Sequence, residues 1–347
     1  MLTARTVARE TLSFDETPLP ALTPGHALVE IHAVSLCGTD PHIFEDDFPT
    51  DLPLVQGHEM AGIIRDADTV GGLQVGDRVA IDPVVACGTC RACRIGRDNV
   101  CQNLSVLGCY EDGGFVEVLS VPVDRLCPVP DDLPLEVAAV GEPASISLQA
   151  VSRAEPAAGE TALVLGCGPI GLLAALGLSE RGVTVVAADT DPDRVALART
   201  FGAAHAFEVG REFPDAGQRA TLDALTEGAG PEIVIEATGV PASLENAIRL
   251  IAPAGRIVQV GISSRSVGLK IKDLTDKEID LRGSRNSRRL IPEGLAMLAR
   301  HPEAADALLT HRFPFSRLAE AFHTMSDRTI PTGKILILMP AAQAVTS

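Results

Sequence analysis

The segment of residues 161–171 constrains the fold of this chain more than any other. It reads T-A-L-V-L-G-C-G-P-I-G, an apolar strand that runs directly into a G-x-G-x-x-G turn and an apolar helix. This order places backbone N–H groups and the positive end of a helix where a pyrophosphate can bind. A second apolar stretch ends at Asp189, whose carboxylate can accept hydrogen bonds from ribose hydroxyls. The pattern predicts a doubly wound, dinucleotide-binding α/β sheet.

The candidate cofactor-binding residues all lie in or just after this segment. They are Gly166, Gly168, Pro169, Ile170, Gly171, Asp189 and Arg194. The Asp189 carboxylate would repel a 2′-phosphate, so the loop favours NAD over NADP. Arg194 qualifies that preference, because it can stack on adenine or turn towards a phosphate. The alternative is a Gly-rich turn of some other doubly wound fold.

Patterning on either side of this segment separates two domains. Strands expected at 233–237, 256–261 and 279–283 alternate with helices, which implies a parallel sheet covered on both faces. Residues 1–36 instead alternate with period two, as in 26–34, which favours an antiparallel β-barrel. With 347 residues, the chain suits a dinucleotide-binding domain at 149–290 and a catalytic domain made of 1–148 and 291–347.

Cys37, His58 and Glu59 supply a thiolate, an imidazole and a carboxylate within one short stretch. These are the ligand types of an open, catalytic Zn²⁺ site. Taken singly, each residue has an ordinary alternative as a core thiol, a core histidine or a surface charge. Glu142 precedes a proline and an apolar run, where a metal would be a natural partner; a glutamate favoured by the helix dipole is an equal alternative.

A second metal site is predicted from a dense run of thiols. Its four members are Cys87, Cys90, Cys93 and Cys101. Four thiolates satisfy the tetrahedral preference of Zn²⁺ and leave no position for substrate, so this zinc is structural. The alternatives are a redox C-x-x-C or an iron–sulfur cluster, but the sequence has neither a thioredoxin-like βαβ context nor a ferredoxin spacing.

Composition excludes some partners. A net charge of −17 argues against a nucleic-acid or anionic-membrane partner, because phosphates require a basic surface. The N-terminus lacks the apolar core of a signal peptide, and other apolar runs are too short to span a bilayer. We therefore expect a cytoplasmic protein, in which the cysteines are metal ligands or core thiols.

Along essentially its whole length the chain resembles the zinc-dependent medium-chain dehydrogenase family, in its branch of polyol, threonine and sugar-acid dehydrogenases. The resemblance rests on C-G-T-D-P-H-I, G-H-E, the four-cysteine segment, D-G-G-F, G-E-P and G-C-G-P-I-G. It implies a GroES-like catalytic domain completed by the C-terminal tail, a Rossmann domain, and an active site in the cleft between them. It also implies a homodimer or homotetramer.

The resemblance assigns roles to individual residues. Cys37 and His58 would bind the catalytic zinc, with Glu59 as a ligand or exchange partner and Glu142 as a ligand, direct or through water. Thr39 would take the substrate proton and pass it through the nicotinamide ribose to His42; the alternative for His42 is a surface histidine. The family's simple-alcohol branch carries cysteine where this chain has Glu142, whereas polyol-type enzymes carry the Glu-Pro found here.

The expected reaction is NAD-dependent oxidation of a secondary alcohol in a polyol or sugar acid, with L-threonine 3-dehydrogenase as the alternative. A chain with no Trp and a single tyrosine, Tyr110, is poorly equipped to enclose apolar substrates. Arg285, Arg288 or Arg289 could hold the carboxylate of an aldonate. Surface or interface ion pairs, or contact with cofactor phosphates, are the alternative for these arginines. A quinone-reductase-like or lens-type binding protein is disfavoured by the metal ligands, and a zinc sensor by the nucleotide loop.

Overall fold

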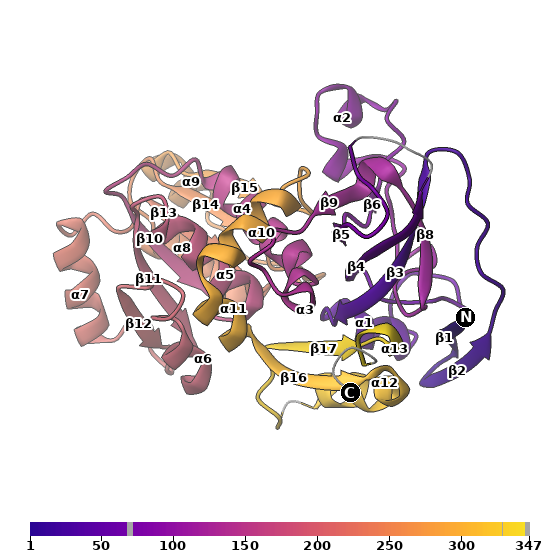
Figure 1. Cartoon of the computed structure of the whole chain (residues 1–347). Coiled ribbons are helices and arrows are strands. Elements are labelled where there is room, and N and C mark those ends of the chain that lie inside the picture. The colour runs from indigo at the N-terminus through magenta and orange to yellow at the C-terminus, as the bar shows by residue number, and fades with distance from the viewer. Residues whose placement is uncertain (68–71, 328, 344–347) are drawn as a thin grey trace. The chain divides into compact units, whose positions relative to one another are not determined.

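The computed structural model describes residues 1–67, 72–327 and 329–343. The chain divides into two compact units (Figure 1): unit 1 is Met1–Ser145 with Arg288–Ser347, and unit 2 is Ile146–Ser287. The chain passes from unit 1 to unit 2 within helix α4 (Gly141–Ala154), and returns after Ser287. The sequence had placed these boundaries at 148 and 290.

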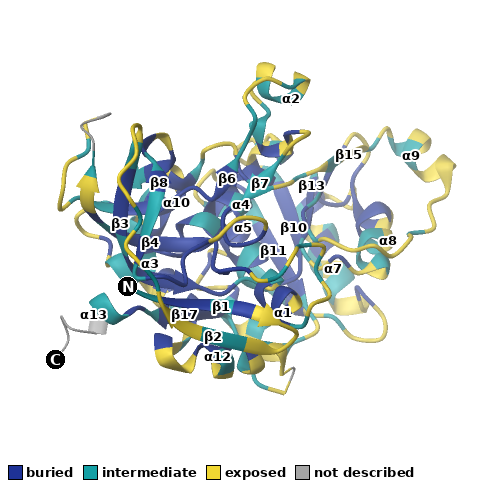
Figure 2. Cartoon of the chain, turned by 90° about the vertical axis from the view of Figure 1, so that its right-hand side faces the viewer, coloured by how far each residue is buried: buried dark blue, intermediate teal, exposed yellow. Residues whose placement is uncertain are grey.

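Within its described residues, unit 2 is built on six parallel strands in the order β12-β11-β10-β13-β14-β15. All residues of β10 and β13 are buried, as expected for apolar runs covered on both faces, and Figure 2 shows both strands in dark blue. The strands are β10 (Thr161–Leu165), β11 (Thr184–Asp189), β12 (His205–Glu208), β13 (Ile233–Glu236), β14 (Arg256–Gln259) and β15 (Asp280–Gly283). The helices are α5 (Pro169–Ser179), α6 (Pro192–Leu197), α7 (Ala216–Thr226), α8 (Pro241–Leu250) and α9 (Ile271–Lys277).

Strand β10 lies at the switch point of this sheet. The chain continues from β10 to β11 on one side, while β13 pairs with its other side. In open parallel sheets, ligands bind at such a point, beyond the carboxyl ends of the strands. The predicted glycine turn begins directly after β10, at that end. The parallel dinucleotide-binding sheet expected from the sequence is confirmed.

In the described part of unit 1, seven strands form a largely antiparallel sheet ordered β16-β17-β3-β4-β5-β9, with β8 also pairing β3. The strands are β3 (His26–Ser35), β4 (Glu59–Ala67), β5 (Arg78–Ile81), β8 (Val118–Pro122), β9 (Leu126–Pro128), β16 (Leu309–Pro314) and β17 (Lys334–Leu338). The GroES-like α/β fold class expected from the resemblance is confirmed by this sheet together with unit 2.

Shorter elements complete unit 1. They are β1 (Leu2–Ala8), β2 (Thr11–Glu16), α1 (Thr39–Phe44), β6 (Val84–Val85), α2 (Arg91–Arg94), β7 (Ser105–Val106), α3 (Leu135–Ala138), α10 (Ile291–Arg300), α11 (Pro302–Leu308), α12 (Leu318–Ser326) and α13 (Pro340–Gln343). Phe322 of α12 contacts two other rings: its centroid lies 4.9 Å from that of Phe44 in α1 and 5.9 Å from that of Phe115, in the loop before β8. Helix α12 therefore packs against α1, the helix that follows Cys37.

Candidate active site and metal centres

The first metal cluster forms where β3 and β4 pair. Ser35, the last residue of β3, lies opposite Glu59, the first residue of β4, and this register brings Cys37 towards His58. The ligand atoms of Cys37, His58 and Glu59 all lie within 4.8 Å of one another. A thiolate, an imidazole and a carboxylate at this separation fit a Zn²⁺ ion with a position left for substrate. The chain thus has the catalytic zinc site expected from the sequence.

Glycine makes the approach to His58 possible. Gly57 has φ +92°, a conformation that L side chains rarely adopt, and a Cβ there would lie 2.9 Å from Val34 Cγ1. His58 and Glu59 are both buried, with 6% and 1% of their surface exposed. The sequence G-H-E therefore combines a turn that requires glycine with two buried polar ligands.

Glu59 is held by two donors that the sequence analysis did not identify. The ammonium of Lys334, the first residue of β17, donates to Glu59 Oε1 and also, over 3.1 Å, to the Leu36 carbonyl. The Ser35 hydroxyl donates to Glu59 Oε2. Lys334 is itself buried, and although burial alone would lower its pKa, the Glu59 carboxylate and other nearby acidic groups raise it overall. Glu59 is therefore part of a buried ion pair.

Asp40 and Cys109 complete the surroundings of His58. Asp40, fully buried, accepts from the Cys37 backbone N–H over 2.8 Å, and its Oδ1 lies 3.9 Å from His58 Nδ1. The Cys109 Sγ lies 3.5 Å from the same nitrogen. Partners of this kind orient a ligating imidazole and fix its tautomer. Asp40 stands in the C-G-T-D motif, which could have signalled it, whereas the sequence gives no sign that Cys109 lies here.

Glu142 lies at the start of α4 but is not one of the three residues whose ligand atoms lie within 4.8 Å of one another. Burial, and then the charge of Glu59, raise the pKa of Glu142 to about 7. The electrostatic effect of Glu59 is consistent with the expectation that both glutamates serve one site. Direct ligation by Glu142 remains a prediction.

Thr39 and His42 share the single short helix α1. The Thr39 Oγ1 lies 3.7 Å from Cys37 Sγ, so this hydroxyl adjoins a zinc ligand. The His42 side chain is 61% exposed, and its Nδ1 lies 2.8 Å from Asp47 Oδ1. An exposed imidazole can exchange a proton with water. The arrangement is compatible with the relay implied by the resemblance, which stays a prediction.

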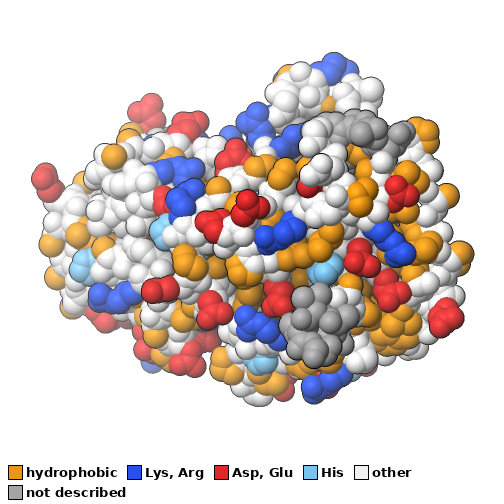
Figure 3. Space-filling model, in the orientation of Figure 1, with side chains coloured by type: hydrophobic (Ala, Val, Ile, Leu, Met, Phe, Trp, Pro, Cys, Tyr) orange, Lys and Arg blue, Asp and Glu red, His pale blue; other side chains and the backbone are white. Residues whose placement is uncertain are grey.

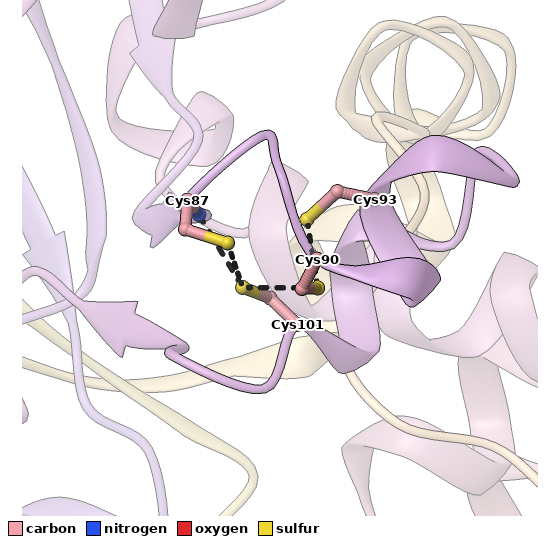
Figure 4. Close-up of side chains that lie close together, drawn as sticks. All are labelled: Cys87, Cys90, Cys93 and Cys101. Atoms are coloured by element: carbon pink, nitrogen blue, oxygen red, sulfur yellow. Dashed lines mark hydrogen bonds between the residues drawn. The ribbon is translucent and has the colours of Figure 1, made fainter.

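Figure 4 shows the four-cysteine site. The sulfurs of Cys90 and Cys93, and those of Cys101 and Cys87, are 3.4 Å apart, and Cys90 to Cys101 is 3.9 Å. Tetrahedral zinc with Zn–S bonds of about 2.3 Å separates its sulfurs by about 3.8 Å. All four sulfurs lie within 4.8 Å of one another. The segment therefore fits the structural zinc that its spacing predicts.

Two of the three arginines considered for a substrate carboxylate contact the four-cysteine segment. Arg288 Nε donates to the Gly96 carbonyl over 2.9 Å, and Arg289 Nε lies 3.3 Å from Asp98 Oδ2. Both line a depression of about 380 Å³ together with Cys93. These contacts agree with the alternative of surface ion pairs for Arg288 and Arg289, and a substrate role for either arginine stays a prediction. Arg285 is exposed.

The nucleotide turn of unit 2 has the geometry that its glycines predict. Gly166 has φ +99°, and a Cβ at Gly171 would overlap the Gly166 carbonyl. Asp189, the last residue of β11, accepts from the Cys167 N–H over 2.6 Å and from the Asp191 N–H over 3.0 Å. Arg194 is paired with Asp191, with Nε 3.6 Å from Oδ2. The acidic residue therefore lies directly beside the turn, as a ribose acceptor requires.

Known proteins match both units. Residues 23–131 match the family model "Alcohol dehydrogenase GroES-like domain", and residues 169–300 match "Zinc-binding dehydrogenase". The chain is 39% identical to L-galactonate-5-dehydrogenase of Escherichia coli (strain K12), over 92% of this chain and 94% of that protein. It is 30% identical to L-threonine 3-dehydrogenase of Bacillus subtilis (strain 168), over 93% and 94%. The crystal structure of the short chain alcohol dehydrogenase rspB from E. coli CFT073, complexed with NADH, aligns with a TM-score of 0.89 and 31% identity over 97% of this chain and 99% of that chain.

Proposed function

The chain belongs to the zinc-containing medium-chain dehydrogenase family, in its sorbitol, threonine and aldonate dehydrogenase branch, and on that premise we propose that it oxidises a secondary alcohol of a sugar acid with NAD⁺. At the coarser level it is a zinc-dependent alcohol, polyol or sugar-acid dehydrogenase that uses NAD(P). The single observation that carries the sugar-acid proposal is the 39% identity to an aldonate dehydrogenase along both units.

The chemistry of the proposed reaction divides between the metal and the chain. Cys37 and His58, with Glu59 or Glu142, would hold a zinc ion, which would supply a Lewis acid that lowers the pKa of an alcohol. The Thr39 hydroxyl would accept the alcohol proton while giving up its own, so that no charge builds up on it, and the exposed His42 imidazole would release a proton to water. Asp189 supports NAD⁺ over NADP⁺ by favouring a free 2′-hydroxyl.

The direct test is the reduction of NAD⁺ with a panel of aldonates, their neutral polyol counterparts, L-threonine and simple alcohols. We expect the highest kcat/KM for an aldonate, and no turnover by His58→Ala. A preference for simple alcohols would refute the proposal. L-threonine is the second candidate, because the chain is similar to an L-threonine 3-dehydrogenase, and preferential turnover of L-threonine would establish it instead.

The arginines give a more specific test of how a carboxylate is bound. We expect Arg285→Ala to raise KM for the aldonate but not for the matching polyol, because a guanidinium forms charge-assisted pairs with carboxylates. Arg288→Ala is the matched control, since its guanidinium donates to the Gly96 carbonyl. Equal effects of both variants on both substrates would exclude Arg285 as the carboxylate partner.

We also propose a homodimer or homotetramer. Large apolar side chains exposed on unit 2, Ile262 at 88% and Ile271 at 80%, support an association surface there. Light scattering on the eluting protein should give a mass two or four times that of the chain. A monomer at micromolar concentration would contradict this expectation.

A further inference from the structure

Glu236 is a fully buried carboxylate that no step of the proposed reaction uses. It is the last residue of β13 and has no exposed surface. Its Oε1 accepts from the Thr238 N–H over 2.9 Å and from the Thr238 hydroxyl. Its Oε2 accepts from the Gly239 N–H over 3.0 Å and from the Gln259 amide. Each carboxylate oxygen of Glu236 therefore accepts two hydrogen bonds.

These donors come from two loops at the same end of the sheet. Thr238 and Gly239 follow β13, whereas Gln259 ends β14. The Glu236 backbone carbonyl also accepts from the N–H groups of Val260 and Gly261, each over 2.9 Å. Glu236 therefore fastens the loop after β13 to the loop after β14 through both its side chain and its backbone.

The loop after β13 packs against the nucleotide turn. A Cβ placed on Gly166 would lie 2.8 Å from Thr238 Cγ2 and 3.3 Å from the Ala237 carbonyl carbon. Gly166 follows β10 and Thr238 follows β13, so the two meet across the switch point of the sheet. Thr238 is exposed although its hydroxyl is anchored to a buried group, and it also accepts from the Val240 N–H over 3.0 Å. Thr238 thus packs against Gly166, the first glycine of the turn, and limits where its backbone can move.

We infer that Glu236 is a positioning residue of the dinucleotide site, holding Thr238 against Gly166 so that the pyrophosphate-binding turn keeps its shape. A glutamine at 236 would direct an NH₂ group at N–H and O–H donors, leaving buried donors unpaired. The loop after β13 would then shift, and Gly166 in the nucleotide turn would lose its packing contact with Thr238. The inference rests on the dinucleotide site of the proposed function and not on the identity of the alcohol.

The test measures binding, without any alcohol substrate. Because the chain has no Trp, the fluorescence of NADH itself reports its affinity, and titration calorimetry reports ADP-ribose and AMP. We expect Glu236→Gln to raise the Kd for NADH and for ADP-ribose about tenfold, the loss of affinity typical of a hydrogen bond to a charged group. The Kd for AMP should change less than about twofold, because AMP lacks the pyrophosphate and would bind at the Asp189 end of the site.

Glu232→Gln is the matched control. Glu232 lies just before the other end of the same strand, where its Oε2 accepts from the Thr161 N–H over 2.8 Å. This variant should bind all three ligands as the wild type does. Should Glu236→Gln fail to fold, Thr238→Val, which removes one donor to Glu236, should weaken NADH binding, and Thr238→Ser, which keeps the hydroxyl but lacks Cγ2, should bind NADH more tightly than Thr238→Val.

Two outcomes would overturn the inference. Unchanged NADH affinity in Glu236→Gln or Thr238→Val, whatever happens to Tm, makes Glu236 a residue of stability only. Equal weakening of AMP and NADH means that the whole unit has loosened. A failed substrate assignment is recognised separately, because it would leave these affinities as described while no aldonate was oxidised.

Discussion

At the scale of single residues, a buried ion pair of Glu59 and Lys334 lies at the candidate catalytic centre. Lys334 is 275 positions away from Glu59 in the chain, yet its ammonium contacts one carboxylate oxygen while Ser35 takes the other. Removing one member of a buried ion pair leaves an uncompensated charge, whereas removing both is far less costly. Lys334 therefore allows the chain to keep a second negative charge beside a thiolate site.

A double-mutant cycle tests this pair. We expect Lys334→Met to lower the free energy of unfolding by about 3–5 kcal/mol, and Glu59→Gln by a smaller amount. The double variant should be more stable than the sum of the single effects predicts, by at least about 1 kcal/mol. Denaturant unfolding measures all four corners of the cycle. Additive losses would show that the two side chains do not interact.

Asp189 sets the second prediction at this scale. Asp189→Ala should narrow the ratio of kcat/KM for NAD⁺ over NADP⁺ by about tenfold, because the repulsion of a 2′-phosphate is removed. Asp193→Ala, an exposed acidic residue in α6, is the control and should leave the ratio unchanged. A wild type that prefers NADP⁺ would mean that Arg194, not Asp189, governs this loop.

The sequence revealed residues that stand in local patterns and missed those that do not. The four clustered cysteines and the glycine turn have short spacings, and Cys37 and His58 stand in the short motifs C-G-T-D-P-H and G-H-E, so local sequence predicted them. Lys334 and Cys109 approach the site through strand pairing and loop packing over long separations. A single Lys or Cys without a spacing pattern is indistinguishable from a surface or core residue. Thr238 and Gly239 lie within three residues of Glu236, but a lone glutamate at a strand end has no spacing pattern that marks it.

At the scale of elements, the four-cysteine segment has little regular secondary structure, and we expect metal binding to stabilise it instead. Residues 87–101 contain only the four-residue helix α2 and a short 3-10 turn, Asp98–Val100, so few backbone hydrogen bonds hold them. Arg288 and Arg289 bind the carbonyl of Gly96 and the carboxylate of Asp98 in this segment. Zinc binding would thus order a loop that Arg288 and Arg289, the first residues of the second part of unit 1, contact directly.

Cys90→Ser should therefore remove one zinc per chain and lower Tm by about 5–10 °C, since domains of this size lose about 2–4 °C per kcal/mol and a structural zinc contributes folding energy. His58→Ala should instead abolish activity with little change in Tm, and retain the four-cysteine zinc. Elemental analysis and thermal unfolding measure both.

Cys127→Ser is the control for Cys90→Ser. Cys127 lies on β9 outside both zinc clusters, and burial raises the pKa of its thiol to about 12, so it remains a neutral core thiol. Its variant should keep both metals. Full zinc content in Cys90→Ser would contradict the assignment of the four-cysteine site.

At the scale of the whole molecule, each unit has its own hydrophobic core. Strands β3, β4 and β17 contribute to the core of unit 1, and strands β10, β11, β13 and β14 to that of unit 2. Figure 3 shows acidic and basic side chains interspersed over the visible face, with the acidic excess reflected in a net charge of −17. Within the described residues, none of the helices combines the length and apolar character needed to cross a bilayer.

Because each unit has its own core, we expect the two units to unfold in separate thermal transitions that different ligands shift. Calorimetry should resolve two transitions, because chains with more than one core often depart from two-state unfolding. Saturating NADH should raise the transition of unit 2 by mass action, whereas a zinc chelator should lower that of unit 1. A single transition that moves equally with both additions would show that the units unfold as one.

Because unit 2 is inserted between the two parts of unit 1, the order of synthesis separates Glu59 from its partner. At about 5–20 residues per second, Lys334 follows Glu59 from the ribosome after roughly 14–55 s. All strands of the nucleotide sheet are complete before β17 exists, so unit 2 can fold first. The charge of the Glu59 carboxylate is therefore balanced only after β17, the last strand of the described residues, has been synthesised.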